Sequence, residues 1–476
     1  QVRDENRKMR VQYIKKYYSF LEDTGIKVPV YIFGHQVMVK ALVLPPNIFN
    51  TVPIFYLTTD IEENDEYGRT FTNKLYDSNR EIRISQQIIL GIGGAKVVEA
   101  LGGADVYHMN EAHPLPLCFQ LYQKFGSWEG VREHSAFTTH TPEKAGNEEN
   151  DIHYLNDIGF FNSVPLNEVR HAANASGDIF NHTAAALHLA KAANAVSHIH
   201  SQVSQDMWSD YHEIPDIIPI TNAQNKRFWS DKELQHAFDK KDRDALKQRK
   251  RELKRILFEE VADQTGKIFD LDTITIVWAR RFAEYKRPDL LLRDMDRVNN
   301  ILENHDRPVQ IIWAGKPYPE DWGAISVFNH LVEFSYKRPK TAVLTGYEIK
   351  LSRMLKQGAD VWLNNPRRPR EASGTSGMTA AKNAAVNLSI QDGWIPEFAR
   401  HGENSFVLPI ADLSLPVHEQ DNFDAANLYQ VLENEMLPIF YDDPDRWWKI
   451  VEQSMADITP GFDSDRMARE YYEKIY

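Results

Sequence analysis

The stretch TITIVWARRF (273–282) decides the fold class of this chain. It is a nearly continuous run of apolar and β-branched residues that ends abruptly in two arginines. Similar runs follow at VQIIWAGKP (309–317), TAVLTGY (341–347), ADVWLNN (359–365) and AAVNLSIQDG (384–393), with amphipathic helical segments between them. Strands that are buried on both faces have this pattern, so the alternation predicts an α/β fold with a parallel, doubly wound sheet.

The first half of the chain carries three more β-rich runs, VPIFYLTTD (52–60), DVYHMNE (105–111) and HSAFTTHTP (134–142). A charged segment over 230–260 separates the halves and predicts a helical pair with a solvated charged face. After Pro409 helical patterns return. We predict three parts: an N-terminal α/β domain over 1–229, a C-terminal Rossmann-like domain over 230–440, and helices over 441–476 that cross back to the first domain.

Composition limits the classes of function. The chain has 476 residues and a formal net charge of -13, which argues against a nucleic-acid or membrane-surface binder. The single cysteine, Cys118, excludes an internal disulfide and indicates a reducing compartment. No apolar run approaches the roughly 20 residues of a membrane helix, and the start is too polar for a signal peptide, so a cytoplasmic protein is expected. The chain has no His or Cys spacing that is typical of a metal site, so we predict no metal.

Cations and a glycine loop follow two of the predicted strands. In an open α/β sheet, ligands bind beyond the carboxyl ends of the strands. Arg280, Arg281 and Lys286 follow the first strand, and Arg281 and Lys286 can converge on one anion. The stretch EASGTSGMTAAKN (371–383) follows another, with two glycines and several hydroxyls before an alanine-rich helical run. This pattern is typical of an anion pocket at a helix N-terminus.

Two histidines and a second glycine motif lie in the first half. His113 and His140 each follow a strand, and each is either a ligand-binding side chain or an imidazole satisfied in the core. The motif GIGG (91–94) resembles a dinucleotide loop, but it follows a helical pattern rather than a strand. We interpret it as a device for close helix packing.

Five segments together resemble the α-glucan (glycogen, starch and maltodextrin) phosphorylase family, especially its short bacterial and archaeal branch. They are VWLNNPRRPREASGTSGM (361–378), ARRFAEYKRPDLLLRDMD (279–296), the run from REIRISQQIILGIGG to VYHMNEAHP (80–114), FTTHTPEKAG (137–146) and DRMAREYYEKIY (465–476). The resemblance implies two Rossmann-like domains that face each other across a cleft, the glycosyltransferase B-type architecture. It also implies retaining transfer of a glucosyl unit from an α-1,4-glucan to phosphate, with pyridoxal phosphate as cofactor.

The resemblance implies roles for individual residues. Arg281 is similar to the arginine that grips the substrate phosphate, and Lys286 to a lysine near the cofactor phosphate. Arg280 stands where many members have another lysine. The sugar and substrate side is assigned to Glu371, Ser373, Gly374, Asn222, His113 and His140, with Glu371 also counted as catalytic beside Arg281 and Lys286. The cofactor side is assigned to Arg280, Thr375, Ser376 and Gly377.

The departures from the family are equally specific. The family has Gly-Met-Lys where this chain has Gly377-Met378-Thr379, and a threonine cannot form an imine with an aldehyde. Lys382 lies one helical turn further on and would reach the cofactor only if the cofactor moved. The chain also begins just after the family's N-terminal glycine-rich loop. The first domain is therefore expected to be incomplete or completed by a partner chain, and a homodimer is a further expectation.

Three functions stay open at this point. The first is a phosphorylase that acts on an α-1,4-glucan or maltooligosaccharide and on phosphate or a sugar phosphate, with pyridoxal phosphate bound non-covalently. The second is a retaining glucosyltransferase without that cofactor, which uses a nucleotide-diphosphate sugar. The third is a glucan-binding or assembly component with little catalysis.

Overall fold

A computed structural model describes residues 2–5, 8–12, 14, 16–75 and 77–476 of the chain. The chain divides into two compact units, of which unit 1 contains Gln1–Gln12, Ser197–His200 and Ile220–Tyr471, and unit 2 contains Tyr13–Val196, Ser201–Pro219 and Tyr472–Tyr476. Both units are mixed α/β structures with a parallel sheet, so the predicted α/β class is confirmed.

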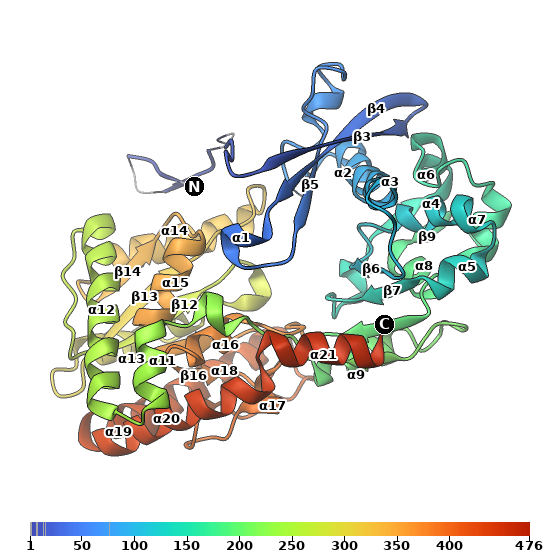
Figure 1. Cartoon of the computed structure of the whole chain (residues 1–476). Helices are drawn as coiled ribbons and strands as arrows, with labels where there is room; N and C mark the ends of the chain where they lie inside the picture. The colour runs from blue at the N-terminus through green and yellow to red at the C-terminus, as the bar shows by residue number, and fades with distance from the viewer. Residues whose placement is uncertain (1, 6–7, 13, 15, 76) are drawn as a thin grey trace. The chain divides into compact units, whose positions relative to one another are not determined.

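Unit 1 is built on a six-stranded parallel sheet, labelled in Figure 1. Its strands are β12 (Ile274–Ala279), β13 (Val309–Ala314), β14 (Thr341–Leu344), β15 (Val361–Asn364), β16 (Val386–Ser389) and β17 (Ser405–Val407). They lie in the order β14-β13-β12-β15-β16-β17. Numbered along the chain this order is 3-2-1-4-5-6, which is the order of the dinucleotide-binding Rossmann sheet.

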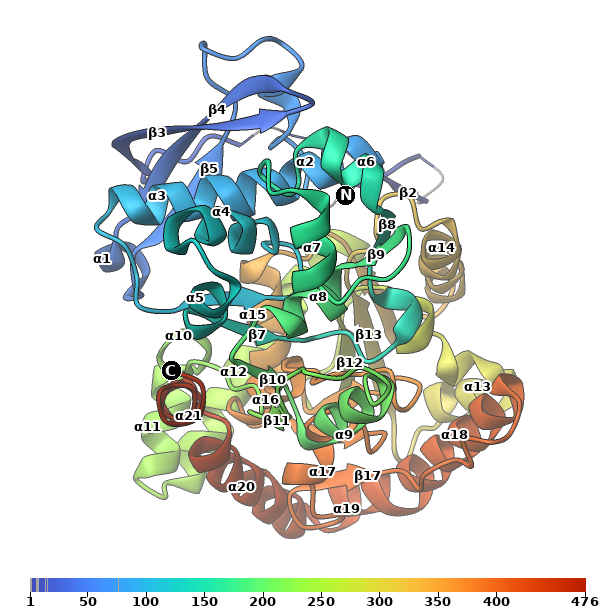
Figure 2. The same cartoon turned by 90° about the vertical axis from the view of Figure 1, so that its right-hand side faces the viewer.

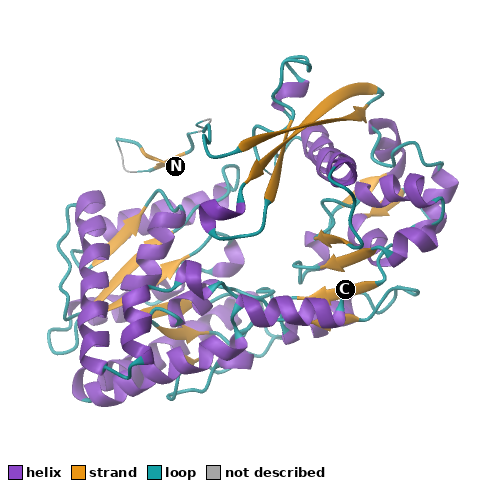
Figure 3. Ribbon diagram, viewed as in Figure 1, coloured by secondary structure: helices purple, strands orange, loops and turns teal. Residues whose placement is uncertain are grey.

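Both faces of this sheet are buried, as the apolar runs predict. Ile276 and Trp278 belong to one core together with residues of α13 (Met295–Glu303) and α14 (Trp322–Tyr336). Val277 and Ala279 alternate with them and belong to a second core with residues of α12 (Arg243–Thr265) and α15 (Ile349–Gly358). Figure 3 shows helices on either side of the strands. Continuous apolar strands are required because neither face meets water.

The charged segment 230–260 forms the predicted helical pair, α11 (Lys232–Asp239) and α12. The prediction of a wholly solvated charged face is wrong for two of its lysines. Lys250 and Lys254 are 3% and 4% exposed. Lys254 pairs with Asp360 at 2.7 Å, and Lys250 donates to the carbonyls of Gln357 and Asn383 at 2.8 Å each. These lysines connect α12 to the end of α15, to the segment that follows α16 (Ser376–Ala381) and to the start of β15. The charge pattern of α12 does not indicate these partners, because they lie in other segments of the chain.

Unit 2 contains a four-stranded parallel sheet and an antiparallel three-stranded sheet. The parallel sheet has the order β11-β10-β7-β6, with β6 (Tyr107–Asn110), β7 (Ser135–Thr138), β10 (Ala192–Ala195) and β11 (Ile217–Pro219). The antiparallel sheet consists of β3 (Glu22–Ile32), β4 (His35–Leu44) and β5 (Ile54–Thr58). The sequence patterns predict β5, β6 and β7 but not the β3–β4 hairpin. Figure 2 shows α2 and α3 beneath this hairpin.

The GIGG motif serves helix packing, as interpreted. It lies at the join of α2 (Arg80–Ile88), a π-helical turn (Ile89–Gly93) and α3 (Gly94–Ala100). A Cβ on Gly91 would lie 2.7 Å from the backbone nitrogen of Leu117 and 2.8 Å from the carbonyl oxygen of Pro114. Only glycine permits this approach to α4 (Pro116–Phe125).

The remaining elements complete the two units. The further strands are β1 (Val2–Arg3), β2 (Met9–Arg10), β8 (Glu149–Asp151) and β9 (Ile179–Asn181). The further helices are α1 (Pro46–Phe49), α5 (Trp128–Glu133), α6 (Ile152–Ile158), α7 (Leu166–Ala172), α8 (His182–His188), α9 (His198–Met207), α10 (Lys226–Trp229), α16 (Ser376–Ala381), α17 (Ile395–Phe398), α18 (Val417–Val431), α19 (Leu437–Asp442), α20 (Pro444–Gly461) and α21 (Ser464–Lys474). Among the described residues, none of the helices combines the length and apolarity needed to cross a bilayer.

Candidate anion and sugar site

The candidate site in unit 1 lies where the strand order of its sheet reverses. β12 and β15 are neighbours, but the chain leaves β12 toward β13 on one side and leaves β15 toward β16 on the other. Loops that diverge in this way leave a crevice beyond the carboxyl ends of the strands. Arg280 follows β12 directly, Asn364 ends β15, and the loop after β15 leads to Glu371.

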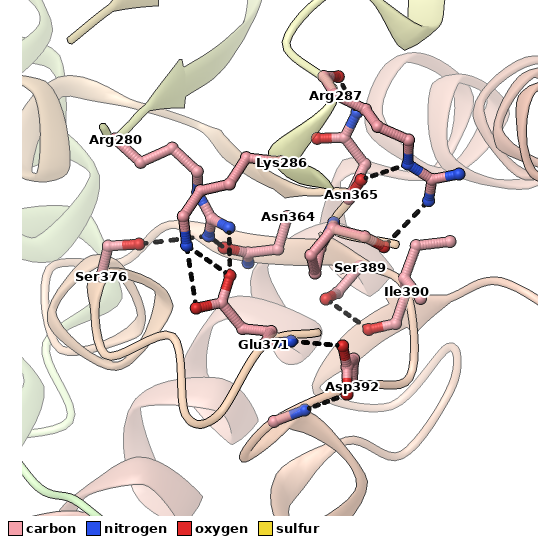
Figure 4. Close-up of polar contacts among 12 residues, drawn as sticks. Arg280, Lys286, Arg287, Asn364, Asn365, Glu371, Ser376, Ser389, Ile390 and Asp392 are labelled. Atoms are coloured by element: carbon pink, nitrogen blue, oxygen red, sulfur yellow. Dashed lines mark hydrogen bonds and ion pairs between the residues drawn. The ribbon is translucent and has the colours of Figure 1, made fainter. Parts of the chain in front are cut away.

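Glu371 is the centre of a three-residue ion-pair cluster with Arg280 and Lys286 (Figure 4). The Lys286 ammonium donates to both carboxylate oxygens, at 2.9 Å to Oε1 and 2.7 Å to Oε2. The Arg280 guanidinium donates from Nη1 to Oε2 at 3.0 Å. We call these three residues the Glu371 cluster. Two residues from the loop after β12 and one from the loop after β15 are thereby held together.

Burial and charge act in opposite directions on Glu371. Burial by itself raises the pKa of this carboxyl, but the charges of Lys286 and Arg280 outweigh it and hold the pKa below its usual value. The residues of the Glu371 cluster are 6% to 9% exposed. The cluster therefore holds two cations and one ionised carboxylate, with a net charge of about +1, away from bulk water.

Arg280 and Arg281 have different surroundings. Arg280 Nη2 also donates to Asn364 Oδ1 and, at 3.4 Å, to Ser376 Oγ, while its Nε has no hydrogen-bond partner. Arg281 is exposed and makes no hydrogen bond or ion pair with any residue that the structure describes. Its charge still acts on Glu371, whose pKa it lowers. Of the two cations predicted to converge, Lys286 is buried in the Glu371 cluster and Arg281 faces solvent.

The loop of residues 373–377 approaches Glu371 closely. Gly374 has φ +82°, and a Cβ there would lie 3.1 Å from Cγ of Glu371. Ser373 is buried, and its hydroxyl has no hydrogen-bond partner. Gly377 faces Asn387, since a Cβ on it would lie 2.4 Å from Asn387 Oδ1. Thr375 precedes the helix α16, which is only six residues long, so the cations rather than the helix terminus supply the positive charge of this site.

Neither Thr379 nor Lys382 offers an amine to this site. The Thr379 hydroxyl is buried within α16 and donates to the Ser376 carbonyl at 2.8 Å. The Lys382 ammonium is 3.6 Å from Asp463 Oδ2, and burial lowers its pKa despite that carboxylate. The residues present therefore fit the phosphate of pyridoxal phosphate, through Arg280 and Lys286, but they do not fit an imine to its aldehyde.

The sequence patterns do not identify two residues that support the Glu371 cluster, Arg287 and Asp392. Arg287 has φ +46° and donates to Asp421 at 2.8 Å and to the carbonyls of Asn365 and Pro366, which fixes the backbone next to Lys286. Asp392 accepts the backbone N–H of Glu371 at 2.9 Å. Burial, with the charge of Glu371, raises the pKa of Asp392 to about 7. Their partners lie 21 or more positions away, so no local pattern could indicate them.

Asn222, His113 and His140 complete the set of predicted residues. Asn222 is half-buried in unit 1 and makes no hydrogen bond to a described residue. In unit 2, His140 Nε2 lies 2.6 Å from Asn110 Oδ1. His113 is half-buried, and burial together with the Arg83 charge lowers its pKa. Glu111, which no motif singled out, has φ +67° and accepts from the His140 backbone N–H at the end of the sheet.

Several known proteins are similar to this chain in sequence. The family model for carbohydrate phosphorylases matches residues 220–430. A glycogen phosphorylase of Aquifex aeolicus is 30% identical over 96% of this chain and 74% of its own length. A maltodextrin phosphorylase of Thermococcus litoralis is 35% identical over 89% of this chain and 57% of its own length. An uncharacterised protein of Methanocaldococcus jannaschii is 48% identical over 100% of this chain and 89% of its own length.

The strand order and the cluster at the switch point define the chain as a doubly wound α/β protein, a class whose members bind ligands at that point of the sheet. Together with these similarities, this architecture places the chain in the α-glucan phosphorylase family, as the motifs predict. The chain spans 57% of the maltodextrin phosphorylase and 58% of a Mycobacterium tuberculosis glycogen phosphorylase that is 32% identical to it.

Proposed function

We propose that this protein is a hexosyltransferase that moves glucosyl units between an α-1,4-glucan and phosphate with retention, and that any pyridoxal phosphate it uses is held without a covalent bond. The observation that carries the proposal is the Glu371 cluster, because it joins two buried cations to a carboxylate at the switch point of the sheet, where ligands of open α/β sheets bind. Membership of a phosphorylase family supports the choice of glucan and phosphate as substrates.

The cationic residues suit the phosphate groups, and Glu371 and Ser373 suit the sugar. Lys286 and Arg280 present N–H donors that suit phosphoryl oxygens, and the solvent-facing guanidinium of Arg281 can bind an arriving phosphate. The Glu371 carboxylate and the unpartnered Ser373 hydroxyl suit sugar hydroxyl groups. When bound, pyridoxal phosphate would supply an acid–base phosphate next to the substrate phosphate, and Arg280 and Lys286 are the residues that would hold it.

A second candidate is a transferase that uses a nucleotide-diphosphate sugar. The observation in its favour is Arg281, whose guanidinium has no partner among the described residues although it adjoins Arg280. A leaving diphosphate carries two phosphoryl groups, and the second could bind to the guanidinium of Arg281.

The test compares donors on the full chain. Maltoheptaose with phosphate, in the presence and absence of pyridoxal phosphate, is expected to give glucose 1-phosphate. UDP-glucose or ADP-glucose with maltotriose would instead release the nucleotide if the second candidate holds. Arg281→Gln should reduce turnover at least tenfold, since a charge-assisted hydrogen bond contributes about 1.5–3 kcal/mol. Arg255→Gln, on the exposed face of α12, is the matched control. Product from neither donor, with glucan still retarding the protein in affinity electrophoresis, would replace both candidates by a glucan-binding role.

A further inference from the structure

The carboxylate of Glu371 occupies the donors that a ligand anion needs. Lys286 directs its ammonium at both carboxylate oxygens, and Arg280 adds a third N–H. Each cation is buried, so in the absence of ligand an internal anion is required to neutralise it. Glu371 fills this role, and Figure 4 shows its carboxylate facing both cationic side chains.

The same contacts limit what Glu371 can do for a sugar. An ionised carboxylate accepts about four hydrogen bonds. Three of these positions are taken by N–H groups of Lys286 and Arg280, which leaves about one for a hydroxyl group. A carboxylate engaged in this way is a poor partner for a glucose unit, whose adjacent hydroxyls usually bind one carboxylate together.

We infer that Glu371 competes with a ligand anion for Arg280 and Lys286. Phosphate binding then releases the Glu371 carboxylate for sugar hydroxyls, and the two ligands bind cooperatively. This inference rests on the proposed function and adds to it a coupling between the two ligands. The two cations have N–H groups that a phosphate could use. Arg280 Nε has no hydrogen-bond partner, and Lys286 donates two hydrogen bonds to the same carboxylate.

The coupling follows from charge and hydrogen bonding. A phosphate that approaches the cations is repelled by Glu371 while the carboxylate accepts their hydrogen bonds. Once the phosphate holds the cations, Glu371 loses counter-charges and gains by accepting hydroxyl hydrogen bonds. The sugar in turn draws Glu371 away from the cations, which favours phosphate. Linkage requires the two effects to be equal, and couplings between sites are commonly about 5–150-fold in affinity.

The experiment measures binding by calorimetry on the full chain, with inorganic phosphate and maltotriose as probes. For the wild-type protein, saturating phosphate should tighten maltotriose binding about tenfold, and saturating maltotriose should tighten phosphate binding by the same factor. Glu371→Gln keeps the shape but removes the charge. It should bind phosphate about tenfold more tightly than the wild type, bind maltotriose more weakly, and show no coupling.

Glu403→Gln is the matched control, because Glu403 pairs with Arg400 at the surface and its side chain is 67% exposed. It should keep the wild-type affinities and the wild-type coupling. If phosphate and maltotriose both bind the wild type with no mutual effect, the inference is overturned while the proposed function stands. The same holds if Glu371→Gln binds phosphate no more tightly. If the wild type and Glu371→Gln both fail to bind phosphate, the proposed function falls and the inference with it.

Discussion

The ammonium of Lys286 lies within 2.9 Å of both carboxylate oxygens of Glu371, although 85 positions separate the two residues in the sequence. This contact joins the loop after β12 to the loop after β15 at the switch point of the sheet. It connects the cations after β12 and the glycine-containing loop after β15 in one buried ion pair. The predictions below concern this pair and the structure that supports it.

Truncation of Glu371 should destabilise the protein. Glu371→Ala leaves Lys286 and Arg280 buried without their counter-charge, and removal of one partner of a buried pair costs about 3–5 kcal/mol. Urea unfolding of the variant and the wild type measures the difference. Glu403→Ala, at the surface, should change the free energy of unfolding by less than about 0.5 kcal/mol. Equal losses in the two variants would contradict a buried ion pair at Glu371.

Lys356 should make the stability of the protein depend on pH. Burial, with the nearby Arg353 charge, lowers the pKa of Lys356 to about 7. In the unfolded chain a lysine titrates near about 10.4, so the unfolded state binds more protons between these pH values, and the free energy of unfolding rises with pH from about 7 upward. Lys356→Met should remove about 1–2 kcal/mol of the rise between about pH 7 and 9.

The matched control for Lys356 is Lys350→Met, an exposed lysine on the same helix, which should keep the wild-type slope. Urea midpoints at several pH values supply the measurement. Identical slopes for Lys356→Met and the wild type would show that Lys356 stays charged in the folded protein.

Gly377 should tolerate no side chain. The Cβ of Gly377→Ala would lie 2.4 Å from Asn387 Oδ1 and 3.1 Å from Trp394, in a fully packed region. Overpacking of this kind costs about 1–3 kcal/mol. The Cβ of Gly461→Ala, at the end of α20, would have no atom within 4 Å. This substitution should leave the stability unchanged or raise it slightly. Thermal unfolding of both variants compares the sites, and a stable Gly377→Ala protein would disprove the close packing of α16 on β16.

Lys382 should not capture pyridoxal phosphate. Its ammonium is buried beside Asp463, and the Thr379 side chain has no amine. Incubation with pyridoxal phosphate, reduction with borohydride and peptide mapping should therefore leave the peptide with Lys382 unmodified, with Lys382→Met as the blank. A reduced adduct on Lys382 in the wild type would show that the cofactor is anchored one turn from the family position.

The sequence by itself determined the α/β class and most strands of the parallel sheets. The apolar run 273–282 became β12 because a strand covered by helices on both faces must be apolar at every position. The motifs around residues 280 and 371 also determined the family, since their order and spacing are specific. The β3–β4 hairpin was missed because its half-buried strands carry a weaker alternating signal.

Only the tertiary structure decided how the charged residues are paired. The sequence places Arg280, Arg281 and Lys286 together, but folding buries Arg280 and Lys286 against Glu371 and leaves Arg281 in solvent. It also buries Lys250 and Lys254 on a helix whose charge pattern predicts solvation. Such outcomes depend on partners more than 80 positions away, and burial rather than residue type then determines which charges must be neutralised internally.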